Sequence, residues 1–406
     1  MGAGWEFGEV LVTPSERGGR VVRWGWNAGG ATPCSPGVTD APTGTPQDHD
    51  APQEAAASPL SGRPGAVRMH SRIALHHGDP LREQRLLEEG LAVVDLGDRG
   101  VVTVSGPDRL SWLHSLLTQQ VGDLAPGQSA EAMVLTPQGR IEHVLHLVDD
   151  GATTWITTDP GHAAPLSSFL ESMRFMLRVE VADRSADLRV VGEPHSAPGL
   201  PGEPPVWVDP WPGPVGATAV RTADDLEVHP GEGWAWREVV LPAEAVEEWV
   251  ADRPLAGWWA LEALRIAAWR PSAQEVDDRS IPHELDWLRT AVHLQKGCYR
   301  GQETVARVQN LGQPPRRLVF LHLDGSGHEL PAVGSEVHSG AVAGDPASGK
   351  VVGRLTSVGR HHELGPIGLA VVKRSAPAEE TLTIGATAAA QEVVVAAGGR
   401  PARRRV

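Results

Sequence analysis

The sequence predicts an α+β protein in which a region of mixed helices and strands precedes a C-terminal β barrel. Between residues 81 and 312, β-branched runs bounded by Gly and Asp alternate with segments whose apolar residues recur at helical spacing. From residue 313 to 398 the pattern changes to short β segments separated by glycine turns, which is typical of a small barrel. These two patterns define the expected domains, and residues 399–406 form a basic tail.

The mixed region begins with a short helix and two β-branched strands. We expect them at residues 81–89, 91–96 and 101–105. A second helix opens after Gly106, because Pro107 suits the first helical position and Asp108 the first turn. Its apolar residues recur at helical spacing and predict a buried face: Leu110, Leu113, Leu117 and Val121.

The same patterns extend through the rest of the mixed region. Strands are expected at residues 132–135, 141–148, 153–157 and 177–181, and helices at residues 163–173, 242–250 and 255–269. Tryptophans at helical spacing in the last of these helices indicate core packing. A final helix over residues 302–310 is stopped by Gly312 and the prolines that follow it.

Composition limits the class of protein. A chain of 406 residues with 41% hydrophobic residues can form two or three domains. It has no run of 18 apolar residues, so we expect no membrane span. A net charge of −15 argues against nucleic-acid binding driven by overall charge. Two cysteines suit a reducing compartment better than a disulfide scaffold, which predicts a cytoplasmic protein.

Residues 1–68 differ in composition from the rest of the chain. Pro, Gly, Ala, Ser and Thr dominate from Gly29 to Gly65 without apolar periodicity. We therefore expect this segment to be disordered, or to be a wrongly extended reading frame with Met69 as the start.

The most informative motif is residues 296–303, which read Lys-Gly-Cys-Tyr-Arg-Gly-Gln-Glu. A thiol on a glycine-flanked turn can face a cavity, and the dipole of the following helix favours its thiolate form. Lys296 and Arg300 could lower the pKa of Cys298 further. The alternative is that Cys298 is a small apolar residue on a structural turn. One cysteine cannot hold an iron–sulfur cluster alone, because such clusters typically need four ligands.

Other charged residues suggest binding of polyanions rather than metals. Five cations form a local basic cluster that could attract a polyanionic ligand, or simply be solvated: Lys296, Arg300, Arg307, Arg316 and Arg317. The adjacent pairs at residues 76–77 and 361–362 lack the spacing of zinc ligands. We therefore expect surface histidines there and no metal site.

Six blocks of sequence resemble the YgfZ family, folate-binding relatives of the glycine-cleavage T-protein. The most specific block is the cysteine motif, which is similar to the family signature K-G-C-Y-x-G-Q-E and continues through residue 308. The others occur in the family's order at residues 94–108, 135–141, 264–266, 281–284 and 352–357. The resemblance covers the chain from about residue 91 to residue 395.

The resemblance implies a ring of two mixed α/β subdomains and a C-terminal barrel, with tetrahydrofolate or a derivative in the central hole. It implies support of iron–sulfur cluster assembly or repair, with iron–sulfur enzymes or cluster-assembly proteins as partners and an indirect link to tRNA modification. The residues implied at the site are Cys298 as the reactive thiol, Arg265 and Glu284 as polar groups of the cavity, Lys296 and Arg300 as electrostatic support, and Tyr299 and Gln302 as further folate contacts.

Two departures from the T-protein pattern weaken an enzymatic role. His143 stands where T-proteins carry the aspartate that supports aminomethyl transfer, and Ala267 stands where they carry a pterin-binding glutamate. We therefore expect a folate-binding protein that is not a self-sufficient catalyst. The alternatives are a tetrahydrofolate-dependent aminomethyltransferase and an interaction scaffold with a vestigial folate site.

Overall fold

The computed structural model describes residues 58–69, 73–195, 203–216 and 228–396, apart from five positions in loops of the barrel. It also describes residue 199 and short strands outside these ranges: β1 (Glu6–Phe7), β2 (Leu11–Pro14), β3 (Arg20–Arg23), β4 (Trp26–Asn27), β15 (Ala219–Val220) and β24 (Ala402–Arg403). Most of the expected N-terminal extension and of the basic tail lies outside the described residues.

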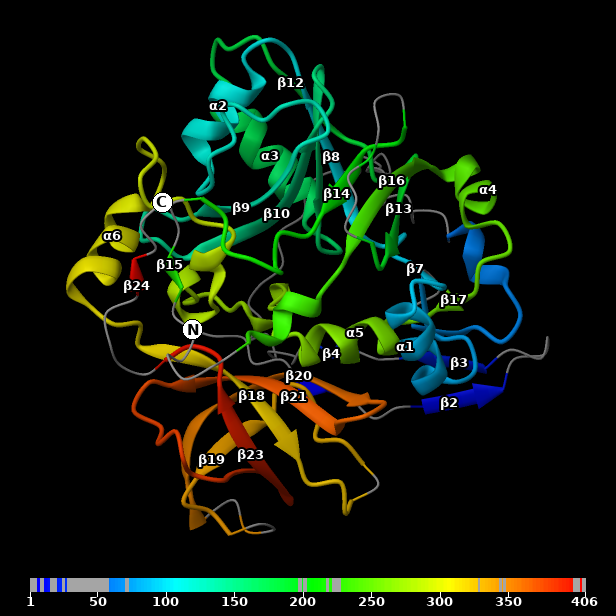
Figure 1. Cartoon of the computed structure of the whole chain (residues 1–406), viewed down its shortest axis with the longest axis vertical. Helices are drawn as coiled ribbons and strands as arrows, with labels where there is room; N and C mark the ends of the chain where they lie inside the picture. The colour runs from blue at the N-terminus through cyan, green and yellow to red at the C-terminus, as the bar shows by residue number, and fades with distance from the viewer. Residues whose placement is uncertain are drawn as a thin grey trace, which may run out of the picture.

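The first sheet has five antiparallel strands in the order β12-β8-β11-β10-β9. Their bounds are β8 (Gly100–Ser105), β9 (Ser129–Leu135), β10 (Ile141–Asp149), β11 (Thr153–Thr158) and β12 (Glu180–Asp183). Helices α2 (Arg109–Leu116) and α3 (Ala163–Met173) lie beside it (Figure 1). The expected apolar stripe of the α2 segment packs here, because Leu113 and Leu117 join Leu166 and Leu170 of α3 in one buried cluster.

The second sheet is mixed and has the order β14-β16-β13-β7-β17. Its strands are β7 (Val93–Asp95), β13 (Leu188–Glu193), β14 (Val206–Val208), β16 (Arg237–Pro242) and β17 (Leu255–Ala256). Three helices accompany it: α1 (Pro80–Glu88), α4 (Val246–Val250) and α5 (Trp258–Ala267). The expected helix over residues 255–269 therefore starts later, because its first two residues extend the sheet beside β7.

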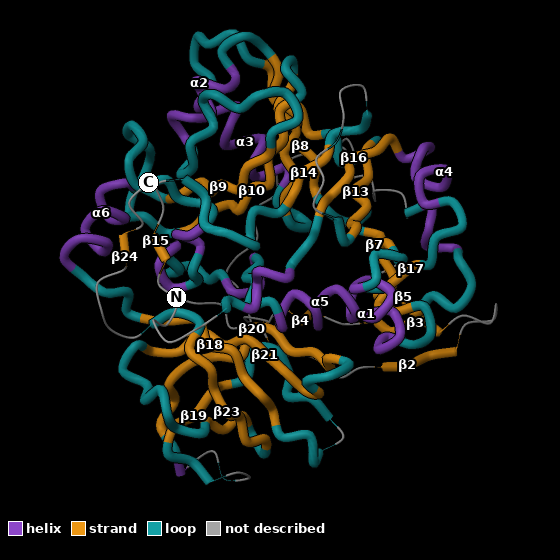
Figure 2. Tube along the Cα trace, in the orientation of Figure 1, coloured by secondary structure: helices purple, strands orange, loops and turns teal. Residues whose placement is uncertain are grey.

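The C-terminal part is a closed six-stranded barrel of order β18-β21-β20-β19-β22-β23. Its strands are β18 (Arg316–Leu323), β19 (Glu336–Ser339), β20 (Lys350–His361), β21 (Gly365–Lys373), β22 (Leu382–Ile384) and β23 (Thr387–Val393). Figure 2 shows this all-strand body below the mixed part, with α5 between them. A Cβ on Gly359 of β20 would lie 3.3 Å from the Cα of Ala263, so the barrel packs closely on α5.

Short helical turns and one further helix connect these bodies. They are η1 (Pro59–Gly62), η2 (Pro230–Gly233), η3 (Ala243–Ala245), η4 (Ala273–Glu275), η5 (Pro282–Glu284), η6 (Trp287–Arg289) and α6 (Gln302–Leu311). The expected α+β class with a C-terminal barrel is confirmed. None of the helices in the described ranges is long and apolar enough to cross a membrane.

The last residues of the N-terminal segment contact the folded body. Strands β5 (Val67–Met69) and β6 (Ile73–His76) pair, and Leu60 is only 1% exposed, in a cluster with Val93 and Val191 of the second sheet. The expectation of an unstructured segment up to residue 68 is therefore wrong for residues 58–68. The packing of residues 58–68 could not be predicted from the sequence, because Leu60 lies among Pro, Gly and Ser and gives no periodic apolar pattern.

Candidate functional site

An open cavity of about 290 Å³, lined by both apolar and polar surface, lies where α1, α5, the loop before β16 and the end of β20 meet. Its wall includes the tryptophans Trp234 and Trp236, whose rings stack at 5.6 Å, and Leu261, Leu264 and Ala267 of α5. Ligand pockets in proteins usually measure about 300–1,000 Å³. The cavity is therefore large enough for a bicyclic heteroaromatic ring but not for a whole drug-sized molecule.

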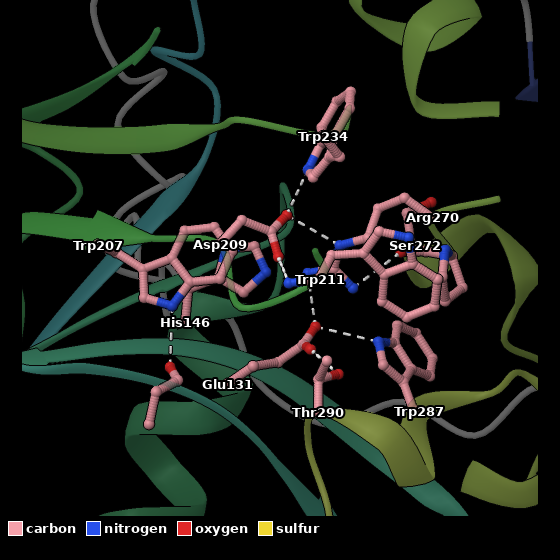
Figure 3. A network of polar contacts seen from close by, with 12 residues as sticks. Glu131, His146, Trp207, Asp209, Trp211, Trp234, Arg270, Ser272, Trp287 and Thr290 are labelled. Atoms are coloured by element: carbon pink, nitrogen blue, oxygen red, sulfur yellow. Dashed lines mark hydrogen bonds and ion pairs between the residues drawn. The ribbon is translucent and has the colours of Figure 1, made fainter. Parts of the chain in front are cut away.

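A buried polar network holds one wall of this cavity in place (Figure 3). The indole Nε1 of Trp234 donates to Oδ2 of Asp209 at 2.8 Å. The same oxygen accepts from Nε of Arg270 at 2.9 Å, and the other side of that guanidinium lies 2.7 Å from Oε1 of Glu131. Because Arg270 is only 4% exposed, both ion pairs lie out of water. The orientation of the Trp234 ring is thus fixed by groups far from it in the sequence.

Further hydrogen bonds complete the network around Glu131. Its two carboxylate oxygens accept from Nε1 of Trp287 at 3.0 Å and from Oγ1 of Thr290 at 2.6 Å. The guanidinium carbon of Arg270 also lies 5.1 Å from the ring centre of Trp211, in a cation–π contact. Each buried charge is therefore paired and hydrogen-bonded, which is the condition for tolerating it inside a protein.

The cysteine motif forms an exposed turn that leads into α6. Cys298 is a free, exposed thiol, and it is not among the residues that line the cavity. Gly301 adopts φ +83°, and a Cβ there would come within 2.6 Å of the carbonyl oxygen of Thr136, so only glycine fits. A Cβ on Gly297 would meet nothing within 4 Å. Of the two flanking glycines, the backbone requires only Gly301.

Lys296 stabilises the turn instead of offering a free charge. Its ammonium donates to the carbonyl oxygens of His114 in the last turn of α2, of Leu117 directly after it and of Gln119 in the following loop. The last carbonyls of a helix have no intrahelical partner and favour such a cation. Burial lowers the pKa of Lys296 to about 8. We therefore assign Lys296 to helix capping, which fixes the position of the cysteine turn on the first sheet.

The other predicted residues of the motif also have partners within the protein. Tyr299 is 7% exposed and belongs to the largest buried apolar cluster. Arg300 donates to Glu142 at 2.8 Å and lies over the ring of Phe169. Gln302 contacts the carbonyl of Lys296 at 3.4 Å. The side chain of Tyr299 is thus a core residue, and Arg300 remains partly accessible beside Cys298.

Arg265 and Glu284 lie elsewhere than expected. Arg265 is buried between Glu262 and Glu275 and donates to Ser357 of the barrel at 2.7 Å. Glu284 accepts from Arg316 and does not pair with Arg265. Neither of them lines the described cavity. Both are fully engaged in joining α5 and η5 to the barrel, so their polar groups do not face a ligand there.

Three of the five cations expected to form a basic cluster make other contacts in the described part of the chain. Arg316 is bound by Asp277 and Glu284, and Arg317 is buried in the barrel, where it donates to Ala376 and Gln391. Together with the capping role of Lys296, these contacts neutralise or bury three of the five cations. Proximity along the chain did not place them on one face.

His143 occupies a buried position on β10. It is 6% exposed, and its Nδ1 atom has no hydrogen-bond partner among the described residues. Its ring meets that of His162 edge-on, with ring centres 5.9 Å apart. Burial, followed by the positive charge on neighbouring groups, lowers the pKa of His143 to about 4. The side chain is therefore neutral at physiological pH and cannot replace a carboxylate.

This low pKa predicts how acid affects stability. The unfolded chain binds a proton at His143 below about pH 6.5, whereas the folded protein binds it only below about pH 4. Acidification between these values therefore favours unfolding. Replacing His143 with phenylalanine should reduce the loss of unfolding free energy between pH 7 and pH 5, measured by urea denaturation. An unchanged pH dependence would show that His143 is not buried as a neutral ring.

Two histidines expected at the surface have buried side chains at or beside this cavity. His361 is 7% exposed and lines the cavity, and Nε2 of His362 lies 2.7 Å from a carboxylate oxygen of Glu88. Glu88, Trp234 and Trp236 were not expected at the site from the sequence. Glu88 lies 274 positions before His362 in the chain, so no local pattern could have joined them.

Comparisons with known proteins give a consistent result. No family model matches the chain. The aligned region covers 73% of this chain and 69% of a protein of Arabidopsis thaliana named as a chloroplastic transferase, and the two are 27% identical there. It is 26% identical over 64% of its length to 69% of the mitochondrial iron–sulfur cluster assembly factor IBA57 homolog of Mycosarcoma maydis. It is also 26% identical over 61% of its length to 76% of the tRNA-modifying protein YgfZ of Klebsiella pneumoniae strain 342.

Among solved structures, the glycine cleavage system aminomethyltransferase T from Bartonella henselae superposes with a TM-score of 0.64. It covers 82% of this chain and 94% of its own length at 17% sequence identity. This likeness confirms the expected T-protein-like fold.

Proposed function

Because this chain belongs to the YgfZ/IBA57 family of T-protein-like proteins, we propose that it binds a reduced folate and supports iron–sulfur cluster assembly or repair. Its partners are then iron–sulfur enzymes or cluster-assembly proteins in the cytoplasm, and tRNA is reached indirectly through enzymes that modify it. The name of one relative gives iron–sulfur cluster assembly as its role, and the name of another gives tRNA modification.

The observation that carries the proposal is the aromatic cavity at the end of α5. Ala267, which stands where T-proteins carry a pterin-binding glutamate, lines this cavity together with Trp234 and Trp236. Stacked indoles suit a flat bicyclic ring, and a volume of about 290 Å³ suits the pterin rather than a complete folate. The residues present thus fit the pterin headgroup of tetrahydrofolate, which carries one-carbon units when it is bound.

The chemistry of the remaining residues favours binding over catalysis. Neutral His143 offers no carboxylate for aminomethyl transfer. Cys298 is an accessible thiol two residues before Arg300 in the sequence, and we assign it as the reactive thiol of the protein. Since one cysteine cannot hold a cluster alone, the partner supplies the remaining ligands in this proposal.

Isothermal calorimetry and thermal denaturation with 5-formyltetrahydrofolate test the proposal. We expect binding heat and a rise in melting temperature, because a ligand that binds only the folded state stabilises it. The affinity should depend weakly on salt, since Lys296, Arg316 and Arg317 are engaged within the protein. If saturating ligand gives no binding heat and no change in melting temperature, the proposal is wrong and the scaffold alternative is favoured. Turnover of an aminomethyl donor would favour the transferase.

A further inference from the structure

The cavity has one polar end in an otherwise apolar wall. Glu88 at the end of α1 and His361 at the end of β20 both line it. His362 lies next to them, with Nε2 2.7 Å from Oε2 of Glu88. The Glu88 side chain is 44% exposed, so His362 does not cover the whole of it. A carboxylate and an imidazole therefore face the space that the two tryptophans flank.

The positions of these groups are set by a buried amide. Gln84, one helical turn before Glu88, is completely buried. Its Nε2 atom donates to the carbonyl oxygen of Arg360 at 2.8 Å, and its Oε1 atom accepts from the backbone N–H of His362 at 2.9 Å. Gln84 thus forms hydrogen bonds with the backbone on both sides of His361, and these bonds hold the end of β20 against α1. The positions of Glu88 and His361 in the cavity are therefore fixed by the packing of α1 against β20.

Hydrogen bonding also determines the tautomer of His361. Its Nδ1 atom accepts from the backbone N–H groups of Glu363 and Leu364, both at 3.2 Å. Burial lowers the pKa of His361, which favours the neutral ring. In a neutral imidazole whose Nδ1 accepts, Nε2 carries the proton. His361 is therefore a hydrogen-bond donor at Nε2.

The same tautomer argues against a metal ion. The possible ligand atoms of Glu88, His361 and His362 lie within 4.8 Å of one another, close enough for a shared ion. A metal-binding histidine usually donates its second ring N–H to an acceptor. Here the second nitrogen of His361 accepts instead, which leaves no lone pair on Nε2. The arrangement is suited to hydrogen bonding with an organic ligand.

We propose that Glu88 is the carboxylate that anchors the pterin ring in this cavity, with His361 as a second polar contact. The proposal rests on the proposed folate binding and specifies the residues that recognise the ligand. A pterin presents a ring N–H and a 2-amino group side by side, which one carboxylate can accept together, and a carbonyl oxygen that an imidazole N–H can reach. Glu88 thus supplies, from α1, the carboxylate that Ala267 of α5 lacks.

Binding measurements on Glu88→Gln test this assignment. The probes are 5-formyltetrahydrofolate and its analogue in which a methyl group replaces the 2-amino group, each titrated by calorimetry. We expect Glu88→Gln to bind the parent ligand about 10- to 100-fold more weakly, the range for losing hydrogen bonds to a charged group. The unmodified protein should discriminate against the methyl analogue, and Glu88→Gln should discriminate far less.

Glu89→Gln is the matched control, because Glu89 is the next residue, is exposed and does not line the cavity. Its affinity should equal that of the unmodified protein, and all three proteins should have the same melting temperature without ligand. If the unmodified protein binds folate and Glu88→Gln binds it equally well, the anchoring role is overturned while the proposed function stands. If the unmodified protein does not bind the parent ligand, both proposals fall.

Discussion

Replacing Arg270 with methionine is expected to lower the free energy of unfolding by about 3–5 kcal/mol, the range for removing one partner of a buried ion pair. Arg270 is paired with Glu131 at 2.7 Å and with Asp209 at 2.9 Å, and all three are buried. The substitution leaves two carboxylates in an apolar interior without their cation. Methionine fills part of the volume but cannot compensate either charge.

Urea denaturation at pH 7 measures this effect. Arg279→Met is the control, because the side chain of Arg279 is 69% exposed and its ion pairs with Asp277 and Asp278 lie at the surface. Surface pairs contribute at most about 1 kcal/mol, so the control should be nearly as stable as the unmodified protein. A loss of less than about 1 kcal/mol for Arg270→Met would mean that the network does not stabilise the fold as described.

Replacing Cys298 with serine is expected to abolish support of iron–sulfur enzymes while leaving the fold intact. The thiol is exposed and the change is nearly isosteric, so the melting temperature should be unchanged. Serine cannot ligate a cluster or exchange thiols as a thiolate does. Gly301→Ala gives a contrasting variant, since its Cβ would collide with the backbone of Thr136. That variant should lose both stability and function.

The parts of the fold that depend on local pattern could be predicted from the sequence. The helix expected over residues 163–173 has these bounds in the structure, and α6 starts at Gln302 as its glycine and first-turn residues indicate. The helix expected from residue 255 was wrong at its start, because β17 takes its first two residues through pairing with a distant strand. Pairing of that kind depends on tertiary contacts that no local propensity records.

The candidate site was harder to predict for the same reason. The cysteine block identified the turn and its free thiol, since a short motif specifies both. It did not reveal that Lys296 caps α2, because the acceptors lie about 180 residues earlier. The cavity wall combines α1, α5 and the end of β20. No sequence motif surrounds Glu88 or His361. Their place at the site becomes evident only when the packing of α1, α5 and β20 is known.

The most direct test of the account is the activity of an iron–sulfur enzyme in cells that lack their native protein of this family. The cells would express either the unmodified chain or Cys298→Ser, at equal protein levels verified by immunoblot. We predict that the unmodified chain restores the enzyme's activity and that Cys298→Ser does not. Full restoration by folded Cys298→Ser would contradict the assigned role of the thiol, and failure of the unmodified chain would contradict the proposed function.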